Sequence, residues 1–176
     1  GMDDRNLVSG LAEVFLQQAR GDTFAGNLLG TDPTGTRRVG NAGMALGTGA
    51  HSSDHLISGN VMIGSQQAVV ISDSGSFYNQ IVGNRIGVGR DGLRPEPLAT
   101  GFTTGVAVSQ SYNRIASNVI AGNTEWGITF GFWASHDSVV TGNLVGTDPE
   151  GKPARPNGRT TWGGGISLLT LSHGFV

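Results

Sequence analysis

FAGNLL at residues 24–29 returns four more times along the chain, as ISGNVM (57–62), IVGNRI (81–86), IASNVI (115–120) and VTGNLV (140–145). Each copy has an apolar residue, two spacers, an asparagine, one spacer and a second apolar residue. The repeated asparagines are Asn27, Asn60, Asn84, Asn118 and Asn143, spaced 33, 24, 34 and 25 residues apart. Repeats of this length are typical of solenoids, in which a unit buries its apolar face only by stacking on the next.

The alternation of short and long spacings indicates loops. The longer units carry extra residues directly after the asparagine segment, at 30–42, 87–104 and 146–162. Two of these stretches begin GTDPTG and GTDPEG, in which Asp caps a turn, Pro fixes φ and Gly accepts a positive φ. We therefore expect three loops that project from one corner of the stack and form a single wall.

A second short strand precedes each asparagine segment. It reads VFLQ (14–17), MALG (44–47), VVIS (69–72), VAVS (106–109), ITFG (128–131) and ISLL (166–169). Because side chains alternate between the faces of a strand, alternate residues predict a core wall. The predicted inward pairs are Val14/Leu16, Met44/Leu46, Val69/Ile71, Val106/Val108, Ile128/Phe130 and Ile166/Leu168. The predicted outward residues are Phe15, Ala45, Val70, Ala107, Thr129 and Ser167.

These strands and bends predict an all-β fold, a right-handed parallel β-helix solenoid of about five to six coils. Stacking at about 4.8 Å places each asparagine above the last, so that their amides can bond in an internal ladder. We expect residues 1–176 to form a single domain, and a piece of a longer solenoid, because neither end of the chain carries a recognisable cap.

The GN-x-[LIV]-G-T-D-P-x-G segments, alternating with G-[IV]-x-[ILV] strands, resemble the parallel β-helix repeat proteins of the pectate-lyase-like superfold. The similarity covers essentially residues 6–176, and the chain especially resembles large bacterial secreted or surface proteins of unassigned role. The resemblance implies an extracellular or cell-surface location. It leaves the activity open, because that superfold carries lyases, hydrolases, epimerases, adhesins and scaffolds.

Composition excludes several classes of partner. The formal net charge is -2 and no run of five like charges exists, so we expect no nucleic-acid partner. No apolar stretch approaches the ~20 residues that span a bilayer, so we expect no membrane insertion. The chain has no cysteine, which excludes a disulfide framework and cysteine zinc sites.

The sequence offers no catalytic set. The predicted outward residues are not ionisable, whereas glycoside hydrolysis generally needs two carboxylates at a defined separation. His51, Asp54 and His55 lie near one turn, and His136 and Asp137 near an equivalent one. We interpret Asp22, Asp54, Asn79, Asn113 and Asp137 as residues that close turns, with the histidines as exposed neighbours. We assign no catalytic residue, no metal site and no cofactor.

Basic residues gather in the three predicted loops, next to aromatic residues. Guanidinium groups with aromatic faces suit acidic or neutral sugars. The candidate ligand-binding residues are Arg37, Arg38, Arg90, Arg94, Arg155, Arg159, Trp126 and Trp162.

Two functions from different classes follow. The first is a non-catalytic structural or adhesive module that contacts polysaccharide through its loop wall, and the alternative is a polysaccharide lyase or glycoside hydrolase domain. Uncapped ends expose unpaired strand edges, which pair with other chains. We therefore also expect self-association through the β-helix ends, with Leu168 and Phe175 at the contact.

Overall fold

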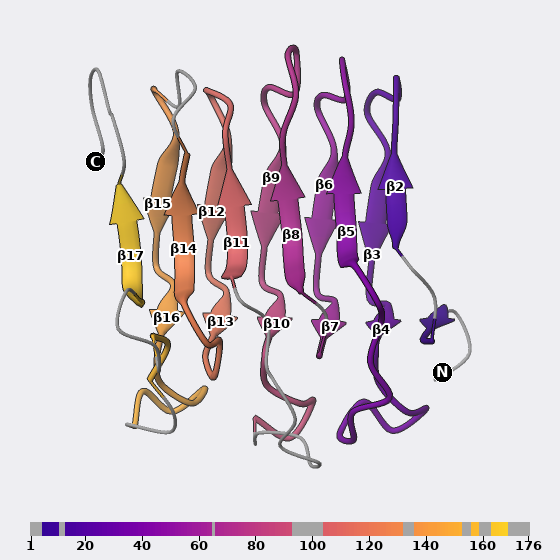
Figure 1. Cartoon of the computed structure of the whole chain (residues 1–176), viewed down its shortest axis with the longest axis vertical. Helices are drawn as coiled ribbons and strands as arrows, with labels where there is room; N and C mark the ends of the chain where they lie inside the picture. Colours follow the sequence, from indigo (N-terminus) through magenta and orange to yellow (C-terminus); the bar gives the residue numbers. More distant parts are fainter. Residues whose placement is uncertain are drawn as a thin grey trace.

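The computed structural model of the chain describes residues 5–10, 13–64, 66–92, 104–131, 136–152, 156–158 and 163–168. Within these residues the regular secondary structure consists of strands, and each named strand pairs in parallel with its neighbours. Figure 1 shows the strands side by side along the molecule, from β2 at one end of the stack to β17 at the other. The fold is a right-handed parallel β-helix, which confirms the predicted fold class.

Three sheets form the walls of the coils. Sheet A contains β1 (Leu7–Val8), β4 (Leu28–Leu29), β7 (Val61–Met62), β10 (Arg85–Ile86), β13 (Val119–Ile120) and β16 (Leu144–Val145). Sheet B contains β2 (Val14–Leu16), β5 (Met44–Thr48), β8 (Gln67–Ile71), β11 (Thr104–Val108), β14 (Trp126–Phe130) and β17 (Gly164–Leu168). Sheet C contains β3 (Thr23–Ala25), β6 (Leu56–Ser58), β9 (Gln80–Val82), β12 (Arg114–Ala116) and β15 (Val139–Thr141).

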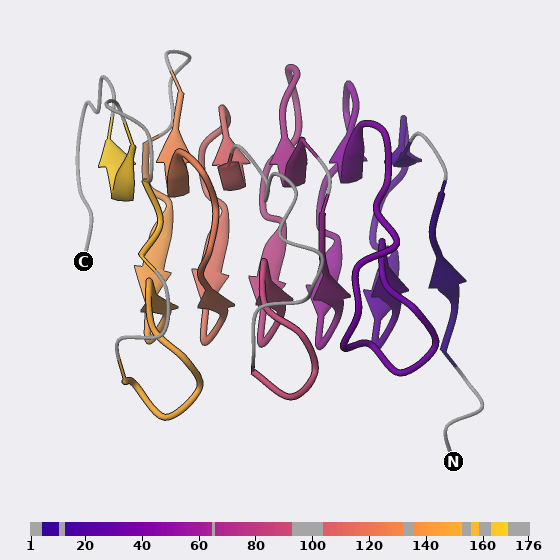
Figure 2. The same cartoon turned by 60° about the horizontal axis from the view of Figure 1, so that its bottom comes forward.

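The chain passes from sheet B to sheet C to sheet A in each coil, which creates three corners. We name them the B–C, C–A and A–B corners after the sheets they join. The three long loops belong to the A–B corner, and Figure 2 shows them leaving the same side of the stack.

Apolar residues from all three sheets meet inside the coils. Those with no exposed surface include Leu46, Val69, Val106, Ile128 and Phe130 of sheet B, Ile57, Ile81 and Ile115 of sheet C, and Leu29, Met62, Ile86 and Ile120 of sheet A. Full burial of such a side chain stabilises the fold by about 1.5–3 kcal/mol. Stacking of the repeats, rather than any single unit, therefore supplies the core.

The register of sheet B corrects the predicted core wall in one coil. Val14 pairs with Leu46 and Leu16 pairs with Thr48. Thr48, and not Met44, is therefore the second inward residue of β5. The prediction aligned MALG with VFLQ from their first residues, whereas the true register lies two residues further along.

The same shift changes the outer face of β5. Ala45, which was predicted to face outward, is completely buried. Gly47 takes the outward place opposite Phe15. A Cβ atom at Gly47 would lie 3.0 Å from the Phe15 ring, so the aromatic ring occupies the space that a larger residue would need.

The predicted inward pair of β17 is not buried. Ile166 and Leu168 are 45% and 48% exposed, although they pair with Ile128 and Phe130 of β14, which are buried. β17 is the outermost strand of sheet B among the described residues. Its inward side chains are therefore covered by a coil on one side only.

The predicted asparagine ladder runs along the C–A corner. The backbone N–H and the Nδ2 of Asn84 both donate to Oδ1 of Asn118, at 2.9 and 3.0 Å. Nδ2 of Asn84 also donates to the carbonyl of Ile57 at 2.8 Å. The paired donation to the next Oδ1 repeats at Asn27, Asn60 and Asn118, which donate to Asn60, Asn84 and Asn143.

Asn6 extends this ladder by one coil beyond the predicted set. Its backbone N–H and Nδ2 donate to Oδ1 of Asn27 at 3.1 and 2.9 Å. The sequence NLV at 6–8 carries the second half of the repeated segment. The first half is absent there, so Asn6 was not included in the predicted ladder.

Candidate functional site

The outer face of sheet B is the first place to look for catalysis. Its outward row is Phe15, Gly47, Val70, Ala107, Thr129 and Ser167. None of these side chains is ionisable. This row therefore provides no carboxylate pair for glycoside hydrolysis.

A groove lies on the outer face of sheet A, next to the C–A corner. Its volume is about 310 Å³. The lining residues are Arg5, Gly26, Leu28, Gly59, Val61, Gly83, Arg85 and Arg90. We name it the arginine groove, because its charged residues are three arginines and none of its lining residues is acidic.

The three arginines reach the groove from different elements. Arg5 precedes the ladder residue Asn6, Arg85 opens β10, and Arg90 follows β10 in the second loop. The side chains that contact a carboxylate at 2.7–3.5 Å elsewhere in the described residues are those of Arg20, His55 and His136. The three arginines therefore share the groove with no acidic lining residue.

Apolar side chains form the floor of the groove. Leu28 and Val61 point outward from sheet A, yet they are 4% and 6% exposed. With Ile63 they form a second, smaller apolar cluster. A Cβ atom at Gly35 would lie 3.0 Å from the Leu28 side chain, so the first loop bends over this face of the sheet.

The loops of the A–B corner contact one another. The backbone N–H of Arg90 in the second loop donates to the carbonyl of Gly35 in the first loop at 2.8 Å. A Cβ atom at Gly92 would lie 2.7 Å from Cδ of Pro149 in the third loop. The predicted single wall of loops is therefore present in the described residues.

The predicted arginines divide into separate groups. Arg90 lines the arginine groove, whereas Arg37 and Arg38 do not. Arg37 is exposed, and its backbone N–H donates to Oδ1 of Asp32 at 3.1 Å. Arg38 lies half-buried against Gly64 of the neighbouring coil. The three described loop arginines therefore lie in different surroundings.

Trp126 is a predicted ligand-binding residue that does not line the groove. Trp126 is half-buried at the start of β14, with its ring against Gly164 of the next coil. Arg94, Arg155, Arg159 and Trp162 lie outside the described residues.

Arg5 and Arg85 were missed by sequence reasoning, although Arg85 has a visible signal. The residue after each repeated asparagine reads Leu28, Val61, Arg85, Val119 and Leu144. Arg85 is the one charged residue in that row, so it interrupts an otherwise apolar outward stripe on sheet A.

The B–C corner carries a second ladder, with mixed residues. The backbone N–H of Asn79 donates to Oδ1 of Asn113 at 2.9 Å, and that of Asn113 donates to the Ser138 hydroxyl at 3.1 Å. The backbone N–H of His55 donates to Oδ1 of Asn79 at 3.1 Å. Asp22 completes the row, because its backbone N–H donates to Nδ1 of His55 at 3.1 Å.

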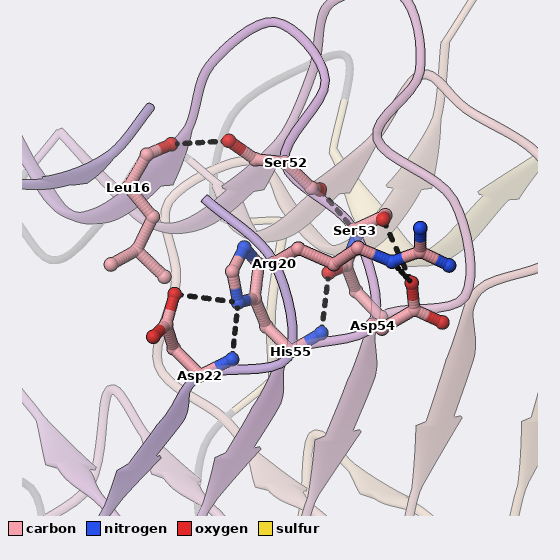
Figure 3. A network of polar contacts seen from close by, with 8 residues as sticks. Leu16, Arg20, Asp22, Ser52, Ser53, Asp54 and His55 are labelled. Atoms are coloured by element: carbon pink, nitrogen blue, oxygen red, sulfur yellow. Dashed lines mark hydrogen bonds and ion pairs between the residues drawn. The ribbon is translucent and has the colours of Figure 1, made fainter. Parts of the chain in front are cut away.

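Figure 3 shows the environment of His55 in this ladder. The residue is 1% exposed, so the prediction that it is an exposed neighbour is wrong. Nδ1 accepts a hydrogen bond, so the neutral ring carries its proton on Nε2. Nε2 is buried and has no hydrogen-bond partner in the described part of the chain. His55 is therefore buried because it occupies a ladder position between Asp22 and Asn79.

Two of the residues predicted to close turns, Asp54 and Asp137, do not occupy the ladder positions of the B–C corner. Asp54 and Asp137 lie one residue before the ladder positions that His55 and Ser138 occupy. Their φ values are 62° and 54°, in the left-handed region where aspartate is one of the tolerated residues. His51 is exposed and His136 is half-buried.

Two tyrosines occupy the same left-handed row as these aspartates. Tyr78 and Tyr112 both have φ of 59°, which is unusual for a bulky residue. Their rings stack with centroids 5.3 Å apart and an interplanar angle of 24°. The rings are 54% and 41% exposed. The signal in the sequence was YN in two consecutive coils, at 78–79 and 112–113.

Asp54 is held ionised beside these tyrosines. The Ser53 hydroxyl donates to its Oδ2 at 2.8 Å, and Nε of Arg20 lies 2.9 Å from the same oxygen. The hydrogen bond from Ser53, with the bond and charge of Arg20, lowers the pKa of Asp54 below its ordinary value despite partial desolvation. Figure 3 shows Arg20 and Ser53 converging on this carboxylate.

The described residues contain neither a candidate metal cluster nor a candidate membrane-spanning helix. No cluster of three or more His, Cys, Asp or Glu side chains there could hold a metal ion. That part of the chain also contains no helix with the length and apolar character needed to cross a bilayer.

Comparison of the chain with protein-family models, with curated proteins and with solved structures finds no match.

Proposed function

We propose that this chain is a non-catalytic β-helix module of a secreted or cell-surface protein that holds acidic polysaccharide in its arginine groove. The observation that carries the proposal is the convergence of Arg5, Arg85 and Arg90 on a groove with no acidic lining residue. The stacked coils supply a rigid surface, which favours a structural or adhesive role. The pectate-lyase-like assignment and the extracellular location belong to the same proposal, and the repeat pattern supports them.

The groove has the chemistry that an acidic sugar requires. Guanidinium groups bind carboxylate or sulfate groups with paired, charge-assisted hydrogen bonds. The volume of about 310 Å³ is at the low end of small-molecule sites, which have about 300–1,000 Å³. The glycines of the corner keep one side of the groove open.

Binding of polygalacturonate and alginate tests the proposal. Wild type should bind both polymers, and added salt should weaken the binding because charged contacts carry it. Replacement of Arg5, Arg85 and Arg90 by alanine together should weaken binding by at least about a hundredfold. Calorimetry at two salt concentrations measures both effects.

Arg114→Ala is the matched control. Arg114 is an exposed arginine that opens β12 in sheet C, away from the groove, so its replacement should leave the affinity unchanged. A wild type that binds neither polymer contradicts the proposal, and so does a triple variant that binds as wild type does. A product assay on the same polymers separates this function from the lyase or hydrolase alternative.

Self-association through the ends of the β-helix is part of the proposal. The exposed Ile166 and Leu168 of β17 support it. Phe175, the other predicted contact residue, lies outside the described residues. Light scattering over a concentration series should show association, and Leu168→Lys should reduce it. A strict monomer at high micromolar concentration would exclude this contact.

A further inference from the structure

The exposed tyrosine pair at the B–C corner lies away from the arginine groove and has no role in the proposed function. A tyrosine in the left-handed region costs about 1–3 kcal/mol unless the surroundings hold it there. Phe77 holds both rings, with its own ring edge-on to Tyr78 at 6.4 Å and to Tyr112 at 6.2 Å. The corner therefore presents a rigid aromatic surface at positions where glycine or aspartate serves in other coils.

One ring face of this pair is not stacked on another aromatic ring of the described residues. Tyr112 is stacked on one side of Tyr78, on the side of the following coil, and His136 lies edge-on to Tyr112 at 5.3 Å. The opposite face of Tyr78 is directed toward the preceding coil. No other aromatic ring of the described residues contacts it, and Tyr78 is the more exposed ring, at 54%.

The preceding coil supplies polar groups beside that face. Asp54 precedes Tyr78 in the row, and its backbone N–H donates to the carbonyl of Phe77 at 3.1 Å. Arg20 and Ser53 both bond to Oδ2 of Asp54. Oδ1 of Asp54 makes no hydrogen bond with the described residues, and the side chain of Arg20 is 80% exposed.

These groups match the chemistry of a neutral sugar. A hydroxyl group both donates and accepts, so it can donate to Oδ1 of Asp54 and accept from the guanidinium of Arg20. The Arg20–Asp54 pair has no net charge, so an ionic ligand gains little from it. The C–H face of a pyranose ring can pack on the electron-rich face of Tyr78.

We infer that Tyr78, with the Arg20–Asp54 pair, forms a binding site for a neutral pyranose unit of a glycan. The site is separate from the arginine groove and does not depend on it. Two sites at different corners would let one module contact two kinds of sugar.

Titration with neutral hexasaccharides of glucose, mannose and xylose tests this site by NMR. At least one of them should shift the ring resonances of Tyr78. Tyr78→Asn keeps a residue that tolerates a positive φ and should weaken that binding by at least about tenfold, because the stacking face is lost. Tyr78→Phe keeps the face and should bind within about threefold of wild type. Asp54→Asn should weaken binding without removing the ring.

Three results would overturn the inference. The first is a wild type that binds none of the three hexasaccharides, and the second is a Tyr78→Asn variant that binds as tightly as wild type. The third is a folded Tyr78→Phe variant, as judged by its amide spectrum, that binds no better than Tyr78→Asn. Polygalacturonate binding should be unchanged in the Tyr78 variants, so this site and the arginine groove can fail independently.

Discussion

The C–A and B–C corners both join neighbouring coils through a ladder of side chains, but they use different residues. At the C–A corner each member from Asn6 to Asn143 is an asparagine. At the B–C corner the row reads Asp22, His55, Asn79, Asn113 and Ser138. The first ladder is uniform, whereas the second varies and borders an exposed aromatic pair, although its members from His55 to Ser138 are also buried.

The difference follows from what each side chain can bond. An asparagine amide offers both an acceptor and two donors, so it can accept from the coil before it and donate to backbone carbonyls. Asn79 does both, because its Nδ2 donates to the carbonyl of Ser52 at 3.2 Å. His55 accepts in the same way, but its Nε2 has no partner in the described part of the chain. Uniform asparagine therefore satisfies more of the buried polar groups, whereas the mixed row of the B–C corner leaves Nε2 of His55 buried without a partner in the described part of the chain.

The largest loss of stability is expected from a substitution that breaks the asparagine ladder of the C–A corner. Asn84→Leu removes the acceptor of the Asn60 N–H and Nδ2 and the donor to the carbonyl of Ile57. Each buried polar group left unsatisfied costs about 1–3 kcal/mol. We expect the free energy of unfolding to fall by more than about 3 kcal/mol, measured by urea denaturation. A midpoint equal to that of wild type would remove the ladder from the account.

Replacing one ladder residue of the B–C corner by the residue type of a neighbouring coil should have an intermediate effect on stability. Asn79→His copies the residue of the previous coil but loses the bond from Nδ2 to the carbonyl of Ser52. It should lower the free energy of unfolding by about 1–3 kcal/mol. The reciprocal change, His55→Asn, supplies an amide and should not destabilise the chain. Thermal melting of both variants checks the comparison, which fails if His55→Asn is the more harmful.

Much of the C–A corner could be predicted from the sequence, because glycine and asparagine recur there in fixed register with apolar residues. The register of β5 could not, since Met44 and Leu46 are both apolar and only the packing of Phe15 on Gly47 distinguishes the two alignments. The position of His55 in the second ladder was also hidden, because histidine is not an expected substitute for asparagine.

The candidate site was predicted only in part for a similar reason. Arg90 could be found from its loop, but its convergence with Arg5 and Arg85 depends on three coils lying side by side. The tyrosines carried no periodic signal beyond YN in two coils. Their stacking follows from the coil spacing and from φ values that the sequence does not reveal.

A smaller effect is expected from the bend before each asparagine of the C–A corner. Gly83 has φ of 66°, and no atom lies within 4 Å of an added Cβ. Gly83→Ala should therefore destabilise the chain through backbone strain alone, by about 1–2 kcal/mol. Ser117 holds the equivalent bend with φ of 56°, so Ser117→Gly should have no destabilising effect. Equal melting temperatures for Gly83→Ala and wild type would contradict this explanation.

The smallest expected effect is the pH dependence of the turn around Asp32, in the first loop of the A–B corner. Desolvation acts to raise the pKa of Asp32, but hydrogen bonds from Thr34, Arg37 and Thr36, with the charge of Arg37, together lower it below its ordinary value of 3.8. The ionised carboxylate therefore stabilises the turn above that value, and this stabilisation is lost as the pH falls through the lowered pKa. The amide resonances of Thr36 and Arg37 should titrate below pH 3.8.

The amide of Asn60 should not follow the same transition, since its acceptor is the neutral amide of Asn84. An Asp32→Asn variant should lose the transition at Thr36 and Arg37. A pH-independent loop in wild type would show that the carboxylate does not hold the turn.

Scalar coupling across the hydrogen bonds of the C–A corner tests the account most directly. The account predicts that the backbone ¹⁵N of Asn84 couples to the side-chain ¹³Cγ of Asn118, because the N–H donates to that Oδ1 at 2.9 Å. The same coupling should link Asn60 to Asn84, whose N–O distance is 3.0 Å. Couplings across the backbone hydrogen bonds of sheet B serve as the internal standard. Their presence, together with the absence of both asparagine couplings, would contradict the ladder that joins the coils.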